Sequence, residues 1–276
     1  MTTTTATIWW ADMENALYVT KERDLDKWED RYTRLHFGQE FCQRLLPDLT
    51  ELDTAIRFAQ DRDADLTLVT PFVTDMALER VAGLMGRLHD RLPGTEVVVN
   101  DLGVLTLIRE RGWDLQPVLG RLLTKQKRGP RVTLLEERIP PAALHHYRRS
   151  NASSSAFQTF LQEHGVRRVE LDNLLQGIDD DLTGSGLSGS LHYPYAYVTT
   201  SRCCPVALCG GSGLRPSLAP CGKECLRYGP FRLLTRHMPV PLVLAGTTQF
   251  YRNDHLPDDL EARGIDRVVH APVPPV

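Results

Sequence analysis

Cysteine is the residue type whose number and spacing in this chain point most directly to chemistry. The chain of 276 residues contains six cysteines, and five of them lie between Cys203 and Cys225. These five are surrounded by Gly, Pro, Ser, Arg and Lys, a loop composition that offers little apolar core for a buried thiol to fill. Among metal groups, thiolates favour zinc and iron–sulfur clusters. The segment therefore predicts a metal or cluster site, with inert buried cysteines as the alternative.

Spacing alone leaves two ligand arrangements open. Cys204 and Cys209 with Cys221 and Cys225 form two close pairs, with four and three residues between partners, which just meets the pattern of a structural zinc site. An iron–sulfur cluster also takes four thiolates, at less regular spacing. The sixth cysteine, Cys42, distinguishes the two arrangements because the zinc site does not use it. The zinc arrangement would belong to a binding or scaffold protein that acts through a partner.

Composition narrows the class of protein. Hydrophobic residues make up 42% and charged residues 24%, as in ordinary globular proteins. A net charge of -3 and a pI near 6.3 argue against nucleic-acid binding by bulk charge. No apolar run approaches the roughly 18 residues of a membrane span, and the first residues lack the pattern of a signal peptide. We therefore expect a cytoplasmic protein with no membrane span, where structural disulfides are rare.

The elements that must position the cysteines alternate between strand and helix. Strands are predicted at residues 5–11, 34–37, 65–69, 96–100, 117–119, 168–171, 195–199, 241–245 and 268–269. Helices are predicted at residues 52–60, 75–92, 104–110, 142–147 and 156–164. This alternation indicates βαβ units and a parallel sheet. The sequence thus predicts one α/β domain over residues 1–276, a (β/α) barrel with some irregularity and a Cys-rich loop near the C-terminal ends of the strands. An open doubly wound sheet is the alternative.

Polar residues at predicted strand ends are candidates for catalysis, since the active sites of (β/α) barrels lie at the C-terminal ends of the strands. Asp101 and Asp172 stand at such ends and could accept a proton or position a polar substrate. For Asp101 the alternative is a cap on the following helix. Arg202, beside the cysteines, could offset the charge of a cluster, or be a solvated loop charge.

Two further segments give structural predictions, one for a strand that bears tyrosines and one for a basic loop. Tyr193, Tyr195 and Tyr197 alternate, which predicts one strand with the three rings on the same face, lining a pocket or packing in the core. The basic segment 124–131 is predicted to be a solvated loop. Peptidase chemistry finds little support, because no GxSxG occurs and no His or Asp can be tied by spacing to one nucleophile.

In four places the sequence resembles the peptidase U32 family. Leu35-His36-Phe37-Gly38 followed by Cys42 is similar to an early strand end of the family. Val99-Asn100-Asp101-Leu102-Gly103-Val104 resembles its "SDLGV" turn. Ser201-Arg202-Cys203 resembles its "GRC" or "ARC" step, and Cys221-x-x-x-Cys225 with Tyr228 its "CxxxC…Y" segment. The lone upstream cysteine and the shorter chain are closest to the UbiU/UbiV branch.

This resemblance implies a function that spacing does not. The similar branch holds a [4Fe–4S] cluster and supports oxygen-independent ring hydroxylation, and other branches resemble nucleobase hydroxylation factors. Carried over, the cluster ligands would be Cys42, Cys203, Cys221 and Cys225, with Cys203 chosen because it directly follows Arg202. The implied protein is an iron–sulfur hydroxylase or hydroxylase component acting on a small aromatic or nucleobase-like molecule, with a paralogous U32-type protein as a possible partner.

Overall fold

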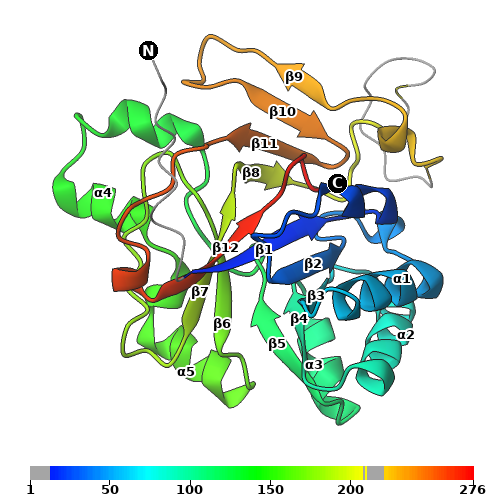
Figure 1. Cartoon of the computed structure of the whole chain (residues 1–276). Helices are drawn as coiled ribbons and strands as arrows, with labels where there is room; N and C mark the ends of the chain where they lie inside the picture. The colour runs from blue at the N-terminus through cyan, green and yellow to red at the C-terminus, as the bar shows by residue number, and fades with distance from the viewer. Residues whose placement is uncertain (1–12, 208, 210–220) are drawn as a thin grey trace.

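Eight parallel strands form a closed barrel (Figure 1). The structure is a computed structural model that describes residues 13–207, 209 and 221–276. The barrel order is β1-β12-β7-β6-β5-β4-β3-β2. The strands are β1 (Glu14–Val19), β2 (Arg34–Gly38), β3 (Asp65–Val69), β4 (Thr95–Val99), β5 (Leu115–Leu119), β6 (Arg168–Asp172), β7 (Ser188–Tyr193) and β12 (Ile265–His270). The predicted (β/α) barrel-like fold is confirmed. The strand predicted at 5–11 lies outside the described residues.

Helices cover only part of the barrel. They are α1 (Leu49–Gln60), α2 (Asp75–Arg91), α3 (Leu102–Glu110), α4 (Pro141–Arg148) and α5 (Ser155–Glu163). They lie between consecutive strands from β2 to β6, so this part follows the regular βα pattern. The β1–β2 and β6–β7 connections contain no α-helix. No helix in the described part of the chain is long and apolar enough to cross a membrane.

Local sequence explains where the helices form. Asp48 and Glu51 form a reciprocal capping box at the start of α1, each side chain accepting from the other's backbone N–H. In α2 the residues that recur at spacings of three and four are the buried ones. They are Ala77, Val81, Leu84, Met85 and Leu88. These helices pack their apolar faces on the outer surface of the barrel in the main core.

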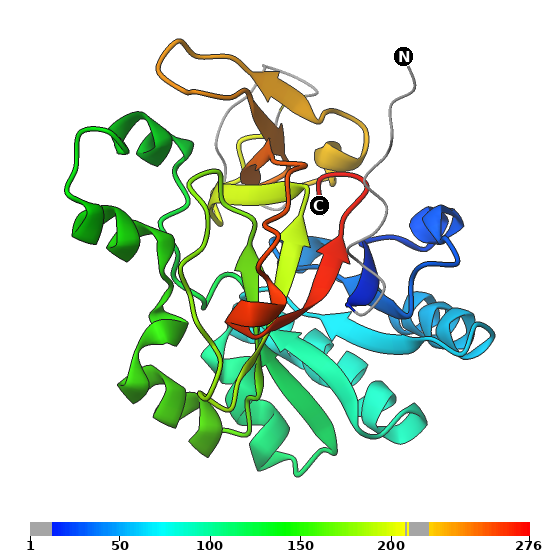
Figure 2. The same cartoon turned by 60° about the vertical axis from the view of Figure 1, so that its left-hand side comes forward.

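A second sheet interrupts the barrel between β7 and β12. It is antiparallel, in the order β8-β11-β10-β9, and both views place it across one end of the barrel (Figures 1 and 2). Its strands are β8 (Tyr195–Thr200), β9 (Phe231–Leu233), β10 (Leu242–Ala245) and β11 (Thr248–Arg252). Phe41 and Leu122, which follow β2 and β5, pack against Tyr197 and Phe250 of this sheet. The sheet therefore caps the C-terminal ends of the barrel strands.

The barrel interior is polar along much of its length, whereas barrels of this type are usually filled by branched apolar side chains. Arg267 on β12 donates to Glu96 on β4, and these strands are not neighbours, so the contact crosses the interior. We call Glu14, Arg34, Glu96 and Arg267 the lower network. We call Tyr18, His36, Glu170 and His192 the middle group, in which His36 on β2 reaches Glu170 on β6. Both sets are at least three-quarters buried.

Candidate functional site

Four of the six cysteines line one pocket beside the capping sheet. The pocket has a volume of about 250 Å³, and its walls include Cys42, Cys204, Cys221 and Cys225. Cys42 follows β2 and Cys204 follows β8. Cys221 precedes the short 3-10 helix Glu224–Leu226, and Cys225 lies within it. The loop after β2 and the segment between β8 and β9 thus bring their thiols to one place at the C-terminal end of the barrel.

The adjacent cysteines 203 and 204 differ in placement. Cys204 lines the pocket and Cys203 does not, although the resemblance had pointed to Cys203. Cys209 does not line it either, so the pairs required by the zinc arrangement are not gathered there. All six cysteines are described, and none forms a disulfide. Among the described residues, no three Cys, His, Asp or Glu side chains are placed so that they could hold a metal ion as they stand.

Burial governs the protonation of the pocket thiols. It raises the pKa of Cys42 and of Cys204, and it raises the pKa of Cys225 to about 11, with smaller contributions from the neighbouring thiols. These mutual contributions agree with the four sulfur atoms sharing one site. A raised pKa leaves little thiolate at neutral pH, so none of these three is an activated nucleophile of the kind a cysteine peptidase uses.

Three cationic side chains, Arg44, Arg202 and Lys223, line the same pocket. Arg202 donates from Nη2 to the carbonyl of Val73 over 2.8 Å, and its guanidinium lies 5.1 Å from the ring centre of Phe72. Arg202 is therefore docked on the loop after β3. Lys223 lies between Cys221 and Cys225 and has a φ of 60°, a left-handed conformation that is uncommon for a residue with a side chain. Both residues line the pocket with the thiols.

Directly beneath the pocket lies a buried ion network, formed by Glu40, Arg121, Arg128 and Asp172, which we call the upper network. Arg121 donates from Nε to both oxygens of Glu40, over 3.2 and 3.1 Å, and from Nη1 to Asp172 over 2.9 Å. Arg128 donates from Nε to the other oxygen of Asp172 over 2.7 Å. Two carboxylates thus balance two guanidiniums, as a buried network requires.

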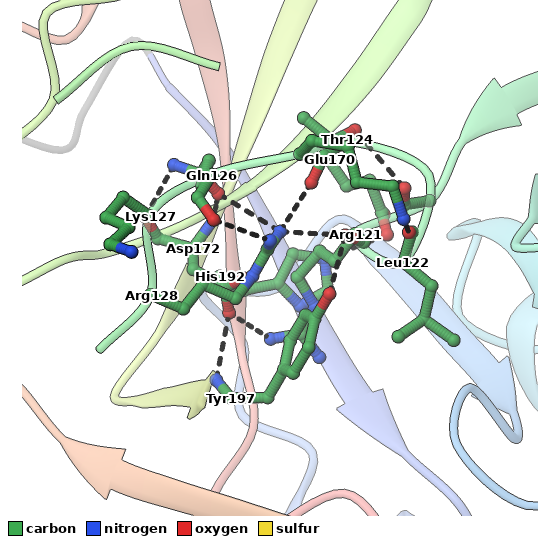
Figure 3. Close-up of polar contacts among 12 residues, drawn as sticks. Arg121, Leu122, Thr124, Gln126, Lys127, Arg128, Glu170, Asp172, His192 and Tyr197 are labelled. Atoms are coloured by element: carbon green, nitrogen blue, oxygen red, sulfur yellow. Dashed lines mark hydrogen bonds and ion pairs between the residues drawn. The ribbon is translucent and has the colours of Figure 1, made fainter. Parts of the chain in front are cut away.

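The upper network also ties the capping sheet to the barrel (Figure 3). The backbone N–H of Tyr197 donates to Asp172 over 3.2 Å, and the Tyr197 hydroxyl donates to the carbonyl of Arg121 over 3.0 Å. The Arg121 guanidinium lies 5.4 Å from the ring centre of Phe41, the residue before Cys42. One side chain therefore contacts both the loop that bears Cys42 and, through Asp172 and Tyr197, the strand that leads to Cys204.

The charges of the upper network are set by burial and by its own members. Burial acts to raise the pKa of Asp172, but Arg121 and Arg128 outweigh it and hold that pKa below its usual range. The pKa of Glu40 is raised, because burial outweighs the attraction of Arg121. Burial acts to lower the pKa of Arg121, but Glu40 and Asp172 reverse this and raise it.

In the middle group, two uncharged histidines flank one carboxylate. His36 Nε2 lies 3.1 Å from one oxygen of Glu170, and His192 Nε2 lies 3.0 Å from the other. Burial lowers the pKa of His36 to about 4, and burial with the nearby Arg121 lowers that of His192 to about 3. Both rings are therefore neutral at physiological pH, and the contacts with Glu170 are not ion pairs.

The predicted catalytic residues fall into different environments. Asp101 caps α3, its Oδ1 accepting from Gly103 N over 2.8 Å and its Oδ2 from Val73 N over 3.1 Å. Asp172 lies in the upper network, and Arg202 lies at the thiol pocket. The three tyrosines do not share one strand: Tyr193 ends β7, while Tyr195 and Tyr197 belong to β8.

Most of the buried polar residues were not predicted from the sequence. The segment 124–131 is not wholly solvated, since Arg128 is only 7% exposed. Glu40 and Arg121 were not singled out, although each stands two residues after the end of a barrel strand. Their position could have indicated that they lie close together, because polar residues just past the strand ends meet at the same end of a barrel.

Comparison with known proteins yields likenesses of structure only. No family model matches the chain, and no curated protein matches it. The structure is similar to that of the U32 peptidase Mk0906, with a TM-score of 0.49 and 10% identity over 96% of this chain and 94% of that one. It is also similar to a plant class V chitinase mutant from Cycas revoluta, with a TM-score of 0.34 and 8% identity over 93% and 94%. These values are too low to assign a family or an activity.

Proposed function

We propose that Cys42, Cys204, Cys221 and Cys225 hold an iron–sulfur cluster of the [4Fe–4S] type, and that the protein is a U32-like redox protein. The observation that carries the proposal is that Cys42 meets the other three thiols at one pocket, although they lie more than 150 residues further along the chain. The predicted ligand set changes at one position, from Cys203 to its neighbour Cys204.

The arrangement of the thiols favours a cluster over a single ion. A zinc ion requires its sulfur ligands at about 2.3 Å from one point. The zinc arrangement needs Cys209, which does not line the pocket, whereas Cys42 does line it. A four-iron cluster bonds each thiolate to a different iron, so its ligands surround a volume. The raised thiol pKa values mean that binding would release protons.

A cluster at this place would supply electron transfer at the mouth of the barrel. The same pocket has aromatic and apolar walls from Phe41, Phe72 and Met76. Its cations are Arg44, Arg202 and Lys223. Apolar walls with a few polar groups are typical of sites for small organic ligands. Together with the U32 resemblance, this supports oxygen-independent hydroxylation, or a related redox step, on a small aromatic or nucleobase-like substrate.

The test is purification without oxygen, followed by a visible spectrum and by measurement of iron, acid-labile sulfide and zinc. We expect a coloured protein with about four iron and four sulfide per chain. A colourless protein with one zinc and no sulfide would refute the cluster and favour the structural zinc site. Incubation of the loaded protein with candidate aromatic compounds under anaerobic conditions, with mass spectrometry for the addition of one oxygen atom, then tests the reaction class.

A further inference from the structure

We infer that the middle group of the barrel encloses at least one ordered water molecule, bound between Tyr18, His36 and His192. The inference rests on polar atoms that are buried and lack a hydrogen-bond partner among the described residues. They are Tyr18 Oη, His36 Nδ1, His192 Nδ1, His192 Nε2 and Glu170 Oε2. Each of the four residues is at least 98% buried. The site is independent of the thiol pocket and of its proposed cluster.

The three rings of the middle group pack against one another edge to face, so their partnerless polar atoms lie in one small region of the barrel. The ring centres of Tyr18 and His36 are 6.4 Å apart, those of Tyr18 and His192 are 6.0 Å apart, and those of the two histidines are 6.2 Å apart. The three residues come from β1, β2 and β7, and Glu170 comes from β6. The rings thus form a triangle inside the barrel.

Leaving these buried atoms without a hydrogen-bond partner would cost a large share of the stability of the fold. A buried donor or acceptor without a partner costs about 1–3 kcal/mol. Five such atoms would cost about 5–15 kcal/mol, which matches the whole stability of a typical domain. If the His192–Glu170 contact at 3.0 Å is taken as a hydrogen bond, three atoms remain and the cost is still about 3–9 kcal/mol. The neighbouring networks above and below show no such accumulation among the described residues.

Hydrogen-bond arithmetic identifies the kind of ligand. A carboxylate only accepts, so the His36 nitrogen bonded to Glu170 carries the ring proton, and His36 Nδ1 is an acceptor. The same holds for His192 Nδ1 when His192 Nε2 faces Glu170. The partnerless atoms thus include two acceptors, and the Tyr18 hydroxyl, which lies near the backbone N–H of Glu40, can donate to only one of them, so the ligand must bring at least one further donor. Water brings two donors and two acceptors and is small enough for a buried site.

The decisive experiment is a crystal structure of the intact protein at a resolution that reveals its other buried waters. We expect a solvent peak within about 3.5 Å of at least two of Tyr18 Oη, His36 Nδ1 and His192 Nδ1. The absence of any peak there would overturn the inference. A peak at about 2.0–2.2 Å from a histidine nitrogen would identify a metal ion instead and would also overturn it.

A solution measurement supplies a second, independent test. Water ¹⁷O relaxation dispersion counts long-lived internal waters, and the count should fall by at least one in His192→Phe. The matched control is Tyr32→Phe, because Tyr32 Oη is already bonded to His270 Nδ1 over 2.6 Å and needs no water. An unchanged count in a folded His192→Phe protein would contradict the inference. Should that variant not fold, the crystal structure of the unmodified protein still decides.

Discussion

Arg121 and Asp172 form a hydrogen-bonded ion pair of 2.9 Å in which neither side chain reaches solvent. Arg121 follows β5 and Asp172 ends β6, so the pair joins neighbouring strand ends beneath the capping sheet. With Glu40 and Tyr197 it links the two segments that carry Cys42 and Cys204. The buried ion pair therefore holds together the segments that form the thiol pocket. Its removal is the subject of the first prediction.

Arg121→Met should be strongly destabilising. The substitution leaves two buried carboxylates with one guanidinium, and removal of one partner from a buried pair costs about 3–5 kcal/mol. Urea unfolding followed by circular dichroism measures the loss. Arg252→Met is the control, because its pair with Asp254 is exposed and worth at most about 1 kcal/mol. Equal effects of the two substitutions would contradict the role assigned to the upper network. Adding Glu40→Gln to Arg121→Met should restore part of the loss.

Cys204→Ser should lose or convert the proposed cluster, whereas Cys203→Ser should keep it. Only Cys204 of this adjacent pair lines the pocket with the other three thiols. Iron and sulfide per chain, with an electron paramagnetic resonance spectrum of the reduced protein, distinguish the two variants. Cys42→Ser should behave as Cys204→Ser does, and Cys209→Ser as Cys203→Ser does. A full cluster in Cys204→Ser with loss in Cys203→Ser would restore the ligand set implied by the resemblance.

Arg202→Met should make the reduction potential of the proposed cluster more negative. Reduction adds negative charge, and the guanidinium beside the thiols favours the reduced state. Arg202→Lys keeps the charge and should shift the potential less. Redox titration monitored by the visible spectrum gives both values. A shift toward positive potential in Arg202→Met would show that this side chain does not act through its charge.

Stability should decline as the pH falls from about 6.5 toward 4. Burial lowers the pKa of His36 from 6.5 to about 4, so the unfolded chain takes up a proton in this range and the folded protein does not. The difference corresponds to about 3 kcal/mol at pH 4 relative to pH 7. His192 acts in the same direction, whereas Glu40, with a raised pKa, offsets part of it at the acid end.

The variant that tests this pH dependence is His36→Asn, which keeps a donor for Glu170 and removes the titration. Urea unfolding at a series of pH values should give a shallower decline than in the unmodified protein. An unaltered slope in His36→Asn would mean that the decline has another source.

Asp101→Ala should cost about 1 kcal/mol, the usual worth of a helix N-cap, and should leave the iron content unchanged. Asp101→Asn retains an acceptor for Gly103 N and should cost less. Thermal unfolding measures the first effect and metal analysis the second. Loss of the cluster in a folded Asp101→Ala protein would indicate a direct role that the capping geometry does not explain.

The sequence predicts the barrel well where strands and helices alternate, because periodicity reports burial directly. From β2 to β6 most predicted strands and helices overlap the observed elements. The capping sheet was not foreseen: strands at 195–199 and 241–245 were predicted, but β9 and β11 were not, and short antiparallel strands carry weak patterns. Strand β7 was missed because it follows a Gly-rich segment that reads as a loop.

The sequence predicts a thiol site, but it does not predict which of two adjacent cysteines belongs to that site. Five clustered cysteines and a distant one indicate a thiol site, yet Cys203 and Cys204 are adjacent, and which one faces the pocket depends on how β8 leaves the cap. The pairing of Arg121 with Glu40 spans 81 residues and leaves no local pattern. A charged residue in a loop is usually solvated, so the burial of Arg121 and Arg128 becomes visible only once the capping sheet is in place.

The capping sheet and the cysteine segment lie within the barrel in chain order, between β7 and β12. Strand β12 pairs with both β7 and β1, so it supplies the two ladders that close the cylinder. Closure joins residues about 250 positions apart and, during synthesis, must wait until the thiol-bearing insertion has been made. A folding intermediate with an open β1 edge is therefore expected while the pocket is still being assembled, and access of iron and sulfide to the thiols is easiest at that stage.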